Sequence, residues 1–241
     1  MKNEQDMSYR EIAEELDTTI SSVKHKYLRL KQKYNEDEHH HPIEKIEQVK
    51  KFIEGGERVL ETHAGYGNLT SCYSNYTDNI ISLEIKRDKV KKLKEKFDHT
   101  IIKCDSEKHF HKFITEGKEF DIIDIDPYGF PSRYFPHILK LLDEDGGFLF
   151  LTFPKFGVQC VNKIMQEHYR IFWGINYKEI NSEEEYIDAI KSQLMDYSLM
   201  MKRAIVEKDR IDLKSVYRFT FYVKRESMLD LCDLTVKGIN D

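Results

Sequence analysis

Four short apolar segments of this chain end in an acidic residue, and sequence with helical spacing lies between them. The segments span residues 58–61, 80–84, 101–105 and 120–126. Strands of a parallel sheet are buried on both faces and therefore read as nearly continuous apolar runs, which helices separate along the chain. The pattern predicts an α/β fold with a mostly parallel sheet. Its acid-bearing strand ends should meet at the edge where such sheets bind ligands.

The later part of the chain predicts how this sheet is completed. Residues 149–153 form an apolar strand after a Gly-Gly turn, and apolar side chains then recur at helical spacing from Ile187 to Met201. Aromatic and polar residues alternate at 217–224, which is typical of a strand with two different faces. We expect this last segment to be a terminal antiparallel strand of the sheet.

Composition restricts the class of protein. The 241 residues suit one α/β domain with a small appendage, and the formal net charge of −5 argues against a surface that is basic throughout. Any contact with nucleic acid should therefore be local. Four cysteines without paired spacing indicate reduced thiols, and no segment resembles a signal peptide or a membrane span. We expect a soluble, cytoplasmic protein without a membrane partner.

The first part of the chain predicts a separate helical module. Residues 8–11 form a capping box, residues 17–19 read as a turn, and a basic helix follows. Three consecutive histidines then lie in a polar segment, but such neighbours rarely converge on one ion, so no metal site is predicted. The expected organisation is a helix-turn-helix module at 1–34, a linker at 35–42 and the larger domain at 43–241.

This module resembles the helix-turn-helix of sigma-factor region four over roughly residues 8–33. The resemblance implies that its second helix enters the major groove of DNA. The alternative is a helical hairpin with a solvated basic face, used for packing or for a homodimer. The residues predicted to contact nucleic acid are Ser21, Ser22, Lys24, Lys26 and Arg29.

The segment after the first predicted strand is rich in glycine. Gly65 and Gly67 allow a tight turn and a close approach of the backbone to a ligand. Glu84 has the position that holds ribose hydroxyls in nucleotide-binding sheets, and Asp105 is placed to bond an adenine amino group. Glu61 would orient a cationic amino group. The full set predicted to bind a cofactor is Glu61, His63, Gly65, Gly67, Asn68, Glu84, Ile85, Asp105 and Ser106.

Asp126, Pro127 and Tyr128 follow the fourth predicted strand and are the predicted catalytic residues. Together they offer a carboxylate acceptor, a fixed backbone carbonyl and a flat aromatic face, which suit a planar base held by its exocyclic amine. The alternative is a strand-ending turn with a packing aromatic ring. The residues predicted to contact the substrate are Gly129, Phe130, Arg133 and Lys155.

The order of these motifs resembles that of the class I S-adenosylmethionine-dependent methyltransferases. Residues 59–70 are similar to the first motif of the ribosomal RNA adenine dimethyltransferases, although His63 stands where that family has glycine. Residues 121–131 are similar to the tRNA guanine-26 dimethyltransferases, with Phe130 in place of a serine. The resemblance spans about residues 57–225. It implies a Rossmann-like fold, S-adenosyl-L-methionine as cofactor, and methyl transfer to an amino nitrogen of a base.

Three functions stay open from the sequence. Methyl transfer to a base in DNA is slightly favoured, because A-form RNA hides its major groove from an inserted helix. Methyl transfer to guanine in tRNA is the alternative that the motif at 126–131 favours. The third is a DNA-binding regulator in which the methyltransferase fold does not catalyse a reaction.

Overall fold

The computed structural model describes residues 8–26, 41–156 and 180–225 of the chain. Its contacts divide the chain into two compact units, residues 1–42 and residues 43–241. Within the described ranges, no helix is long and apolar enough to cross a membrane.

The front unit contains two short helices joined by a turn. α1 spans Tyr9–Glu15, and residues 20–26 are helical. The predicted capping box is confirmed, because the Ser8 amide donates to Oε2 of Glu11 at 2.6 Å and the Glu11 amide donates to Oγ of Ser8 at 3.3 Å. This exchange satisfies two amide groups at the first turn of α1.

The second unit is built on a seven-stranded sheet with the order β3-β2-β1-β4-β5-β7-β6. Strands β1 to β5 pair in parallel, whereas β7 is antiparallel to β5 and β6 is antiparallel to β7. The predicted mostly parallel sheet with a terminal antiparallel strand is therefore confirmed. The strands are β1 (Val59–Thr62), β2 (Ile80–Glu84), β3 (Thr100–Lys103), β4 (Ile122–Ile125), β5 (Gly147–Pro154), β6 (Arg203–Asp212) and β7 (Val216–Arg225).

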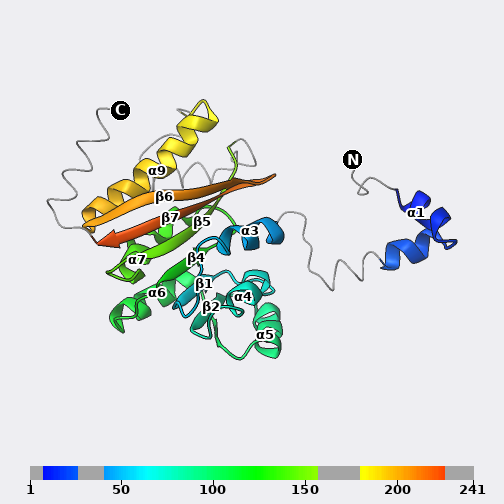
Figure 1. The fold of residues 1–241 in the computed structure, drawn as a ribbon, viewed down its shortest axis with the longest axis horizontal. Coiled ribbons are helices and arrows are strands. Elements are labelled where there is room, and N and C mark those ends of the chain that lie inside the picture. Colours follow the sequence, from blue (N-terminus) through cyan, green and yellow to red (C-terminus); the bar gives the residue numbers. More distant parts are fainter. Residues whose placement is uncertain (1–7, 27–40, 157–179, 226–241) are drawn as a thin grey trace. The chain divides into compact units, whose positions relative to one another are not determined.

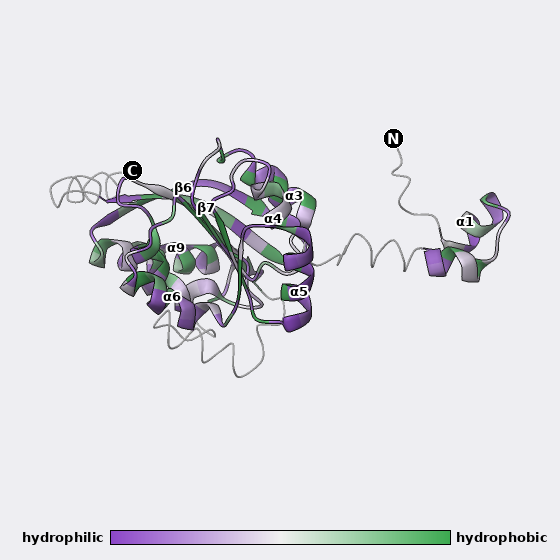
Figure 2. Cartoon of the chain, turned by 90° about the horizontal axis from the view of Figure 1, so that it is seen from below, coloured by the Kyte–Doolittle hydropathy of each residue, from purple (hydrophilic) through white to green (hydrophobic). Residues whose placement is uncertain are grey.

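Helices cover both faces of this sheet. Helices α3, α4 and α5 pack on one face, and helices α6, α7 and α9 pack on the other (Figure 1). In Figure 2 the inner strands are largely hydrophobic, and hydrophilic residues gather on the outer sides of the helices. The bounds are α3 (Pro42–Val49), α4 (Asn68–Tyr73), α5 (Arg87–Lys96), α6 (Ser106–Thr115), a 3-10 helix η2 (Pro131–Tyr134), α7 (Phe135–Leu141) and α9 (Glu183–Met200).

The two faces of the sheet differ in polarity. Under α6, α7 and α9 the core is apolar and includes Leu60, Ile123 and Leu149. Under α3 and α4 the strands begin apolar, for example at Val59, but become polar toward their carboxyl ends. Because side chains alternate along a strand, these polar residues lie on one face of the sheet, the face that α3 and α4 cover. Its buried polar members are Glu61, Ser82, Asp124, Thr152 and Arg218.

Three features differ from the sequence expectations. Strand β6 was not predicted. Arg218, expected on the polar side of the terminal strand, is fully buried, because α3 and α4 cover that side. In α3, Ile43 was expected on the apolar side but is 69% exposed, whereas Lys45 is 3% exposed. The helix is thus turned so that a lysine faces the sheet.

Candidate active site

Three neighbouring strands, β2, β1 and β4, end at the same edge of the sheet. Thr62 of β1 is level with Leu83 of β2 and with Ile125 of β4. The residues that come next along the chain therefore lie together at the carboxyl edge of the sheet. These residues are His63, Glu84 and Asp126. The structure thus brings predicted cofactor-binding and catalytic residues to the same edge.

The turn after β1 depends on glycine. Gly67 has φ +85°, and a Cβ on it would lie 2.6 Å from Cε2 of Phe97 and 2.8 Å from Cδ2 of Leu93. Only glycine lets this backbone approach α5 so closely. His63 also has a positive φ of 59°, and its Nδ1 lies 2.8 Å from the hydroxyl of Thr62. This contact holds the imidazole at the strand end.

Glu61 is a buried carboxyl group at the end of β1. Its Oε2 accepts hydrogen bonds from Oγ1 of Thr70 at 2.5 Å and from Oγ of Ser82 at 3.0 Å. Burial raises the pKa of Glu61 to about 8, even though both hydroxyls favour the ionised form. Glu61 is therefore mostly neutral at pH 7, and a cationic group nearby would ionise it.

Glu84, at the end of β2, is tied to the glycine turn. Its Oε2 accepts from the amide of Gly65 at 3.0 Å and its Oε1 accepts from the amide of Lys86 at 2.8 Å. The next side chain, Ile85, is 57% exposed. The carboxylate of Glu84 and the exposed apolar side chain of Ile85 thus lie beside the glycine turn.

Asp105 and Ser106 lie where β3 passes into α6. Asp105 is the N-cap of α6, and its carboxylate accepts from the amide of Glu107 at 3.0 Å. Ser106 is 6% exposed. Asn68 begins α4 directly after Gly67, so it belongs to the same turn as the glycines.

Asp126 makes an ion pair that the sequence did not predict. The ammonium of Lys45, in α3, lies 2.6 Å from Oδ2 of Asp126. Burial by itself would raise the pKa of Asp126. The charges of Lys45 and Arg218, with hydrogen bonds from Lys45 and Thr152, lower that pKa to about 2. Asp126 is therefore an ionised hydrogen-bond acceptor at neutral pH.

The residues after Asp126 are divided between surface and core. Pro127 is half-buried and Tyr128 is 81% exposed, while Gly129 has φ +107° with open space where a Cβ would lie. Phe130, predicted to contact substrate, is 5% exposed and packs in the apolar core. The aromatic face that stands at the surface is therefore that of Tyr128.

Arg133 and Lys155 also have protein contacts. The guanidinium of Arg133 donates a short hydrogen bond to the hydroxyl of Tyr134, which in turn lies 3.4 Å from Nε2 of His63. Arg133 thus lies near the strand edge. Lys155, after β5, forms a close ion pair with Asp212 of β6.

A buried charge network lies directly beneath this edge. The two carboxylate oxygens of Asp124 accept from Arg218 at 3.0 and 2.6 Å, and the hydroxyl of Tyr73 donates to Asp124 at 2.6 Å. The Arg218 and Asp124 side chains are 0% and 1% exposed. Neither was identified from the sequence, because the two residues are 94 positions apart and each stands in a strand-like run.

The front unit contains the residues predicted to contact nucleic acid. Ser21, Ser22, Lys24 and Lys26 lie in its second helix and are exposed. The amide of Ser22 donates to Oγ1 of Thr19 at 3.1 Å, which caps that helix. Arg29 lies outside the described residues.

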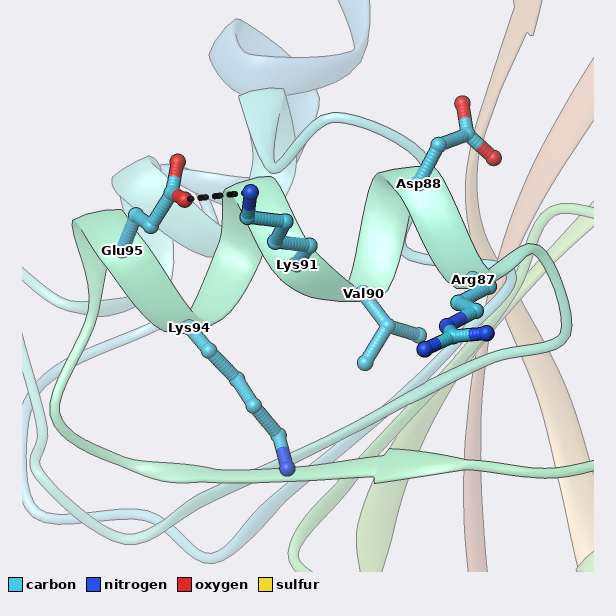
Figure 3. A pocket seen from close by; sticks show the side chains of 6 residues that line it. All are labelled: Arg87, Asp88, Val90, Lys91, Lys94 and Glu95. Atoms are coloured by element: carbon cyan, nitrogen blue, oxygen red, sulfur yellow. Dashed lines mark ion pairs between the residues drawn. The ribbon is translucent and has the colours of Figure 1, made fainter.

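Two other features of the molecule bear on ligand binding. A surface hollow runs along α5, and its lining includes none of the predicted site residues, so we do not assign a cofactor to it (Figure 3). Among the residues that the structure describes, no group of three or more His, Cys, Asp or Glu side chains is arranged to hold a metal ion. The hollow is lined by Arg87, Asp88, Val90, Lys91, Lys94 and Glu95.

Sequence comparison places the chain in no family, since no family model and no curated protein matches it. Solved structures do resemble it. Trm5b from Pyrococcus abyssi is 12% identical, with a TM-score of 0.55 over 75% of this chain and 48% of its own. Trm1 from Pyrococcus horikoshii, solved with S-adenosyl-L-methionine, is 14% identical, with a TM-score of 0.54 over 70% of this chain and 51% of its own.

A third similar structure is the tRNA m1G37 methyltransferase of M. jannaschii, which is 14% identical, with a TM-score of 0.50 over 76% of this chain and 47% of its own. The chain thus spans about half the length of these proteins. Likeness at such low identity defines the fold. The second unit has the Rossmann-like fold of class I methyltransferases, as the sequence predicted.

Proposed function

We propose that the chain is an S-adenosylmethionine-dependent methyltransferase that acts on an exocyclic amino nitrogen of a nucleic-acid base. The observation that carries this proposal is the position of two loops. The glycine turn follows β1 and the sequence Asp126-Pro127-Tyr128 follows β4, and these strands are parallel neighbours. A ligand at each loop would meet the other above one sheet edge.

The residues at the glycine turn fit this cofactor. Glu61, buried and mostly neutral, would ionise beside the cationic amino group of a bound amino acid. Glu84 carries carboxylate oxygens at the turn, and the exposed Ile85 offers an apolar surface for a flat base. Asp105 would accept from an adenine amino group. S-adenosyl-L-methionine, when bound, supplies a methyl group that is already activated on a sulfonium.

The residues after β4 fit an amine acceptor. An exocyclic amine is a poor nucleophile because its lone pair is delocalised into the ring. The ionised Asp126 and the carbonyl of Pro127 would accept its two hydrogens and so favour a more tetrahedral nitrogen. Tyr128, at 81% exposure, would stack on a base that has left its helix. The chain's own part is thus orientation and hydrogen bonding.

A basic helix beside the glycine turn supports a polyanionic substrate. Residues 86–96 carry seven basic and two acidic residues in a chain whose formal net charge is −5. In Figure 3 the side chains of Arg87 and Lys94 extend to the same side of α5. We propose that this face contacts phosphates of the substrate, as Lys and Arg do in nucleic-acid complexes. Its exposed basic members are Arg87, Lys91 and Lys94, which are spaced at i, i+4 and i+7 and line the hollow along α5.

The proposed substrate is DNA, with tRNA as the second candidate. The capped pair of helices in the front unit, with exposed Lys24 and Lys26, favours DNA. Similarity to a solved structure named as a tRNA m1G37 methyltransferase favours tRNA. One labelling experiment distinguishes the two candidates, because each gives a different labelled nucleic acid.

The test is to incubate the purified protein with methyl-labelled donor and with separate pools of DNA and tRNA. Label in DNA supports the first candidate, and label in tRNA alone supports the second. Mass spectrometry of digested nucleosides should place the methyl on an exocyclic nitrogen. Absence of label from both pools, with donor binding intact, would contradict the proposed activity and favour a non-catalytic regulator.

A further inference from the structure

Lys45 has an environment that is rare for a lysine. Its side chain is 4% exposed, and its ammonium donates a hydrogen bond to Oδ2 of Asp126 at 2.6 Å. Burying an ammonium costs free energy unless the group is paired and hydrogen-bonded, because burial removes the charge from water. Asp126 provides that pairing, although 81 residues separate the two along the chain.

Helix α3 fixes the place of this ammonium. Val49 is fully buried in a cluster with Val59 and Phe150. Nε2 of Gln48 donates to the carbonyl oxygen of Arg218 at 3.2 Å, which ties α3 to β7. Lys45 precedes these two anchors by three and four residues, so it lies on the same face of the helix. Its side chain is therefore aimed at the sheet.

Stability alone explains this ion pair poorly. The attraction between two buried charges often does no more than offset their loss of hydration, and apolar residues of similar volume usually serve as well. The pair instead stands at the strand end that carries the proposed acceptor of the substrate amine. The position of this ion pair therefore fits a role in binding the substrate amine.

We propose that Lys45 is a positioning residue of the methyl-acceptor site, which holds Asp126 ionised and fixes the orientation of its carboxylate toward the substrate amine. This inference rests on the proposed function for its role in catalysis. The coupling between Lys45 and Asp126, however, can be measured without any substrate.

Several other groups act on Asp126, and they do not replace Lys45. Arg218 is attractive, but it forms two hydrogen bonds to Asp124, whose negative charge offsets much of its own. Thr152 donates a hydrogen bond but has no charge. Lys45 is therefore the main uncompensated cation at this carboxylate. The surrounding groups are Lys45 of α3, His63 after β1, Asp124 of β4, Thr152 of β5 and Arg218 of β7.

The proposal predicts how Asp126 titrates. With Lys45 present, the pKa of Asp126 is about 2, so the carboxylate holds no proton at neutral pH. Without Lys45 the burial remains and the attraction is lost, so the pKa should rise. Protonated Asp126 would accept the substrate amine less well, and activity would then fall toward acidic pH.

The decisive measurement is an NMR titration of the Asp126 carboxyl carbon in protein labelled with carbon-13 aspartate. Asp126→Asn assigns the signal. We expect a pKa below about 3 in the unaltered protein, and a rise of more than about one pH unit in Lys45→Met. Lys45→Arg should keep the pKa low because it keeps the charge. Lys51→Met is the matched control, since Lys51 pairs with Asp209 at 2.8 Å but its side chain is 55% exposed.

Methyl transfer gives the second readout. In Lys45→Met, kcat should fall toward acidic pH with a midpoint at the raised pKa of Asp126, by about tenfold one pH unit below that pKa, and should recover above it, with KM for the nucleic acid changed less than about threefold. A merely structural role would give a loss that pH does not reverse. Lys51→Met should show neither effect.

Two results would overturn the proposal. One is a pKa of Asp126 at or above about 4 in the unaltered protein. The other is a pKa that stays unchanged in Lys45→Met. If Lys45→Met does not fold, the pKa of Asp126 in the unaltered protein and in Lys45→Arg still tests the proposal. A shifted pKa in a protein that labels no nucleic acid would support the coupling and contradict the proposed activity instead.

Discussion

Glu61 in β1 and Asp126, directly after the neighbouring β4, lie on the same face of the sheet, yet their pKa values shift in opposite directions. The pKa of Glu61 is raised to about 8, and that of Asp126 is lowered to about 2. Burial acts to raise the pKa of both carboxyls, so burial alone does not separate them. The partners do, because Glu61 accepts hydrogen bonds from the uncharged residues Thr70 and Ser82, whereas Asp126 accepts one from the ammonium of Lys45.

This difference gives each carboxyl a separate chemical role. A neutral, buried Glu61 is prepared to ionise when a cationic group binds beside it. An ionised Asp126 is prepared to accept hydrogen bonds from a neutral amine. The network beneath them strengthens the contrast, since the charge of Asp124 raises the pKa of Glu61 and that of Arg218 lowers the pKa of Asp126.

The largest expected effect removes the ionised member of the pair. Asp126→Asn keeps the shape but loses the charge that accepts from the substrate amine, so kcat should fall by about a thousandfold. Donor affinity should change less than about twofold, because the donor binds at the glycine turn. Radiolabel transfer and calorimetric titration measure the two quantities. Full activity in this variant would remove Asp126 from the mechanism.

The next effect removes the cation that lies below Asp126. Arg218→Met leaves Asp124 buried and unpaired, so the free energy of unfolding should fall by about 3 kcal/mol or more. The matched control is the double variant Arg218→Met with Asp124→Leu, which buries no charge and should regain much of that loss. Urea unfolding followed by circular dichroism measures both. Equal stability of the single and double variants would show that the pair is not coupled.

The sequence predicted the parts of this fold that repeat a simple pattern. The strand at 80–84 has the predicted bounds, because an apolar run between polar turns marks a buried strand. The strand at 101–105 ends earlier, at Lys103, and Asp105 caps α6 instead. β6 was missed because four charged residues follow one another at 207–210, as on an exposed edge strand, and only its first two residues are buried.

The candidate site, like the fold, could be predicted only in part from the sequence. Glu61, Glu84 and Asp126 could be placed at one edge because each ends an apolar run, but their charge states could not. Those states depend on Lys45 and Arg218, which lie far from Asp126 in the chain. A lysine in an amphipathic helix predicts solvent exposure, and no local pattern shows that α3 turns this residue toward a carboxylate.

A smaller effect tests the neutral member of the pair. The pKa of Glu61 rises from an ordinary 4.5 to about 8 on folding, so the unfolded chain releases this proton first. The free energy of unfolding should therefore decrease as the pH rises from about 5 to about 8, by up to about 1.4 kcal/mol per pH unit. Glu61→Gln should abolish this component. Thermal unfolding at a series of pH values measures it.

Donor binding sharpens the same test. If Glu61 ionises on meeting a cationic amino group, binding should release a proton, and affinity should rise several-fold between about pH 6 and 7.5. Calorimetry in buffers of different ionisation enthalpy detects that proton. Glu61→Gln should bind the donor more weakly and show no proton release. The same proton release in Glu61→Gln would assign it to another group.

The smallest expected effect concerns the basic residues of α5, which are not part of the Glu61 and Asp126 sites. Lys91→Glu with Lys94→Glu reverses two exposed charges on α5, so affinity for nucleic acid should fall about threefold to tenfold at physiological salt. The slope of log affinity against log salt should decrease by about 1.5 or more, because each lost phosphate contact contributes about 0.7–0.9. Fluorescence anisotropy at several salt concentrations measures both.

The control for this helix reverses Lys112 and Lys140, which are exposed on α6 and α7 across the sheet from α5. It makes the same change in net charge without touching the proposed phosphate face, so its salt slope should match that of the unaltered protein. If both double variants lose affinity equally, net charge alone explains the effect. Neither variant should alter the pKa of Glu61 or Asp126, because exposed charges several residues away are screened by salt.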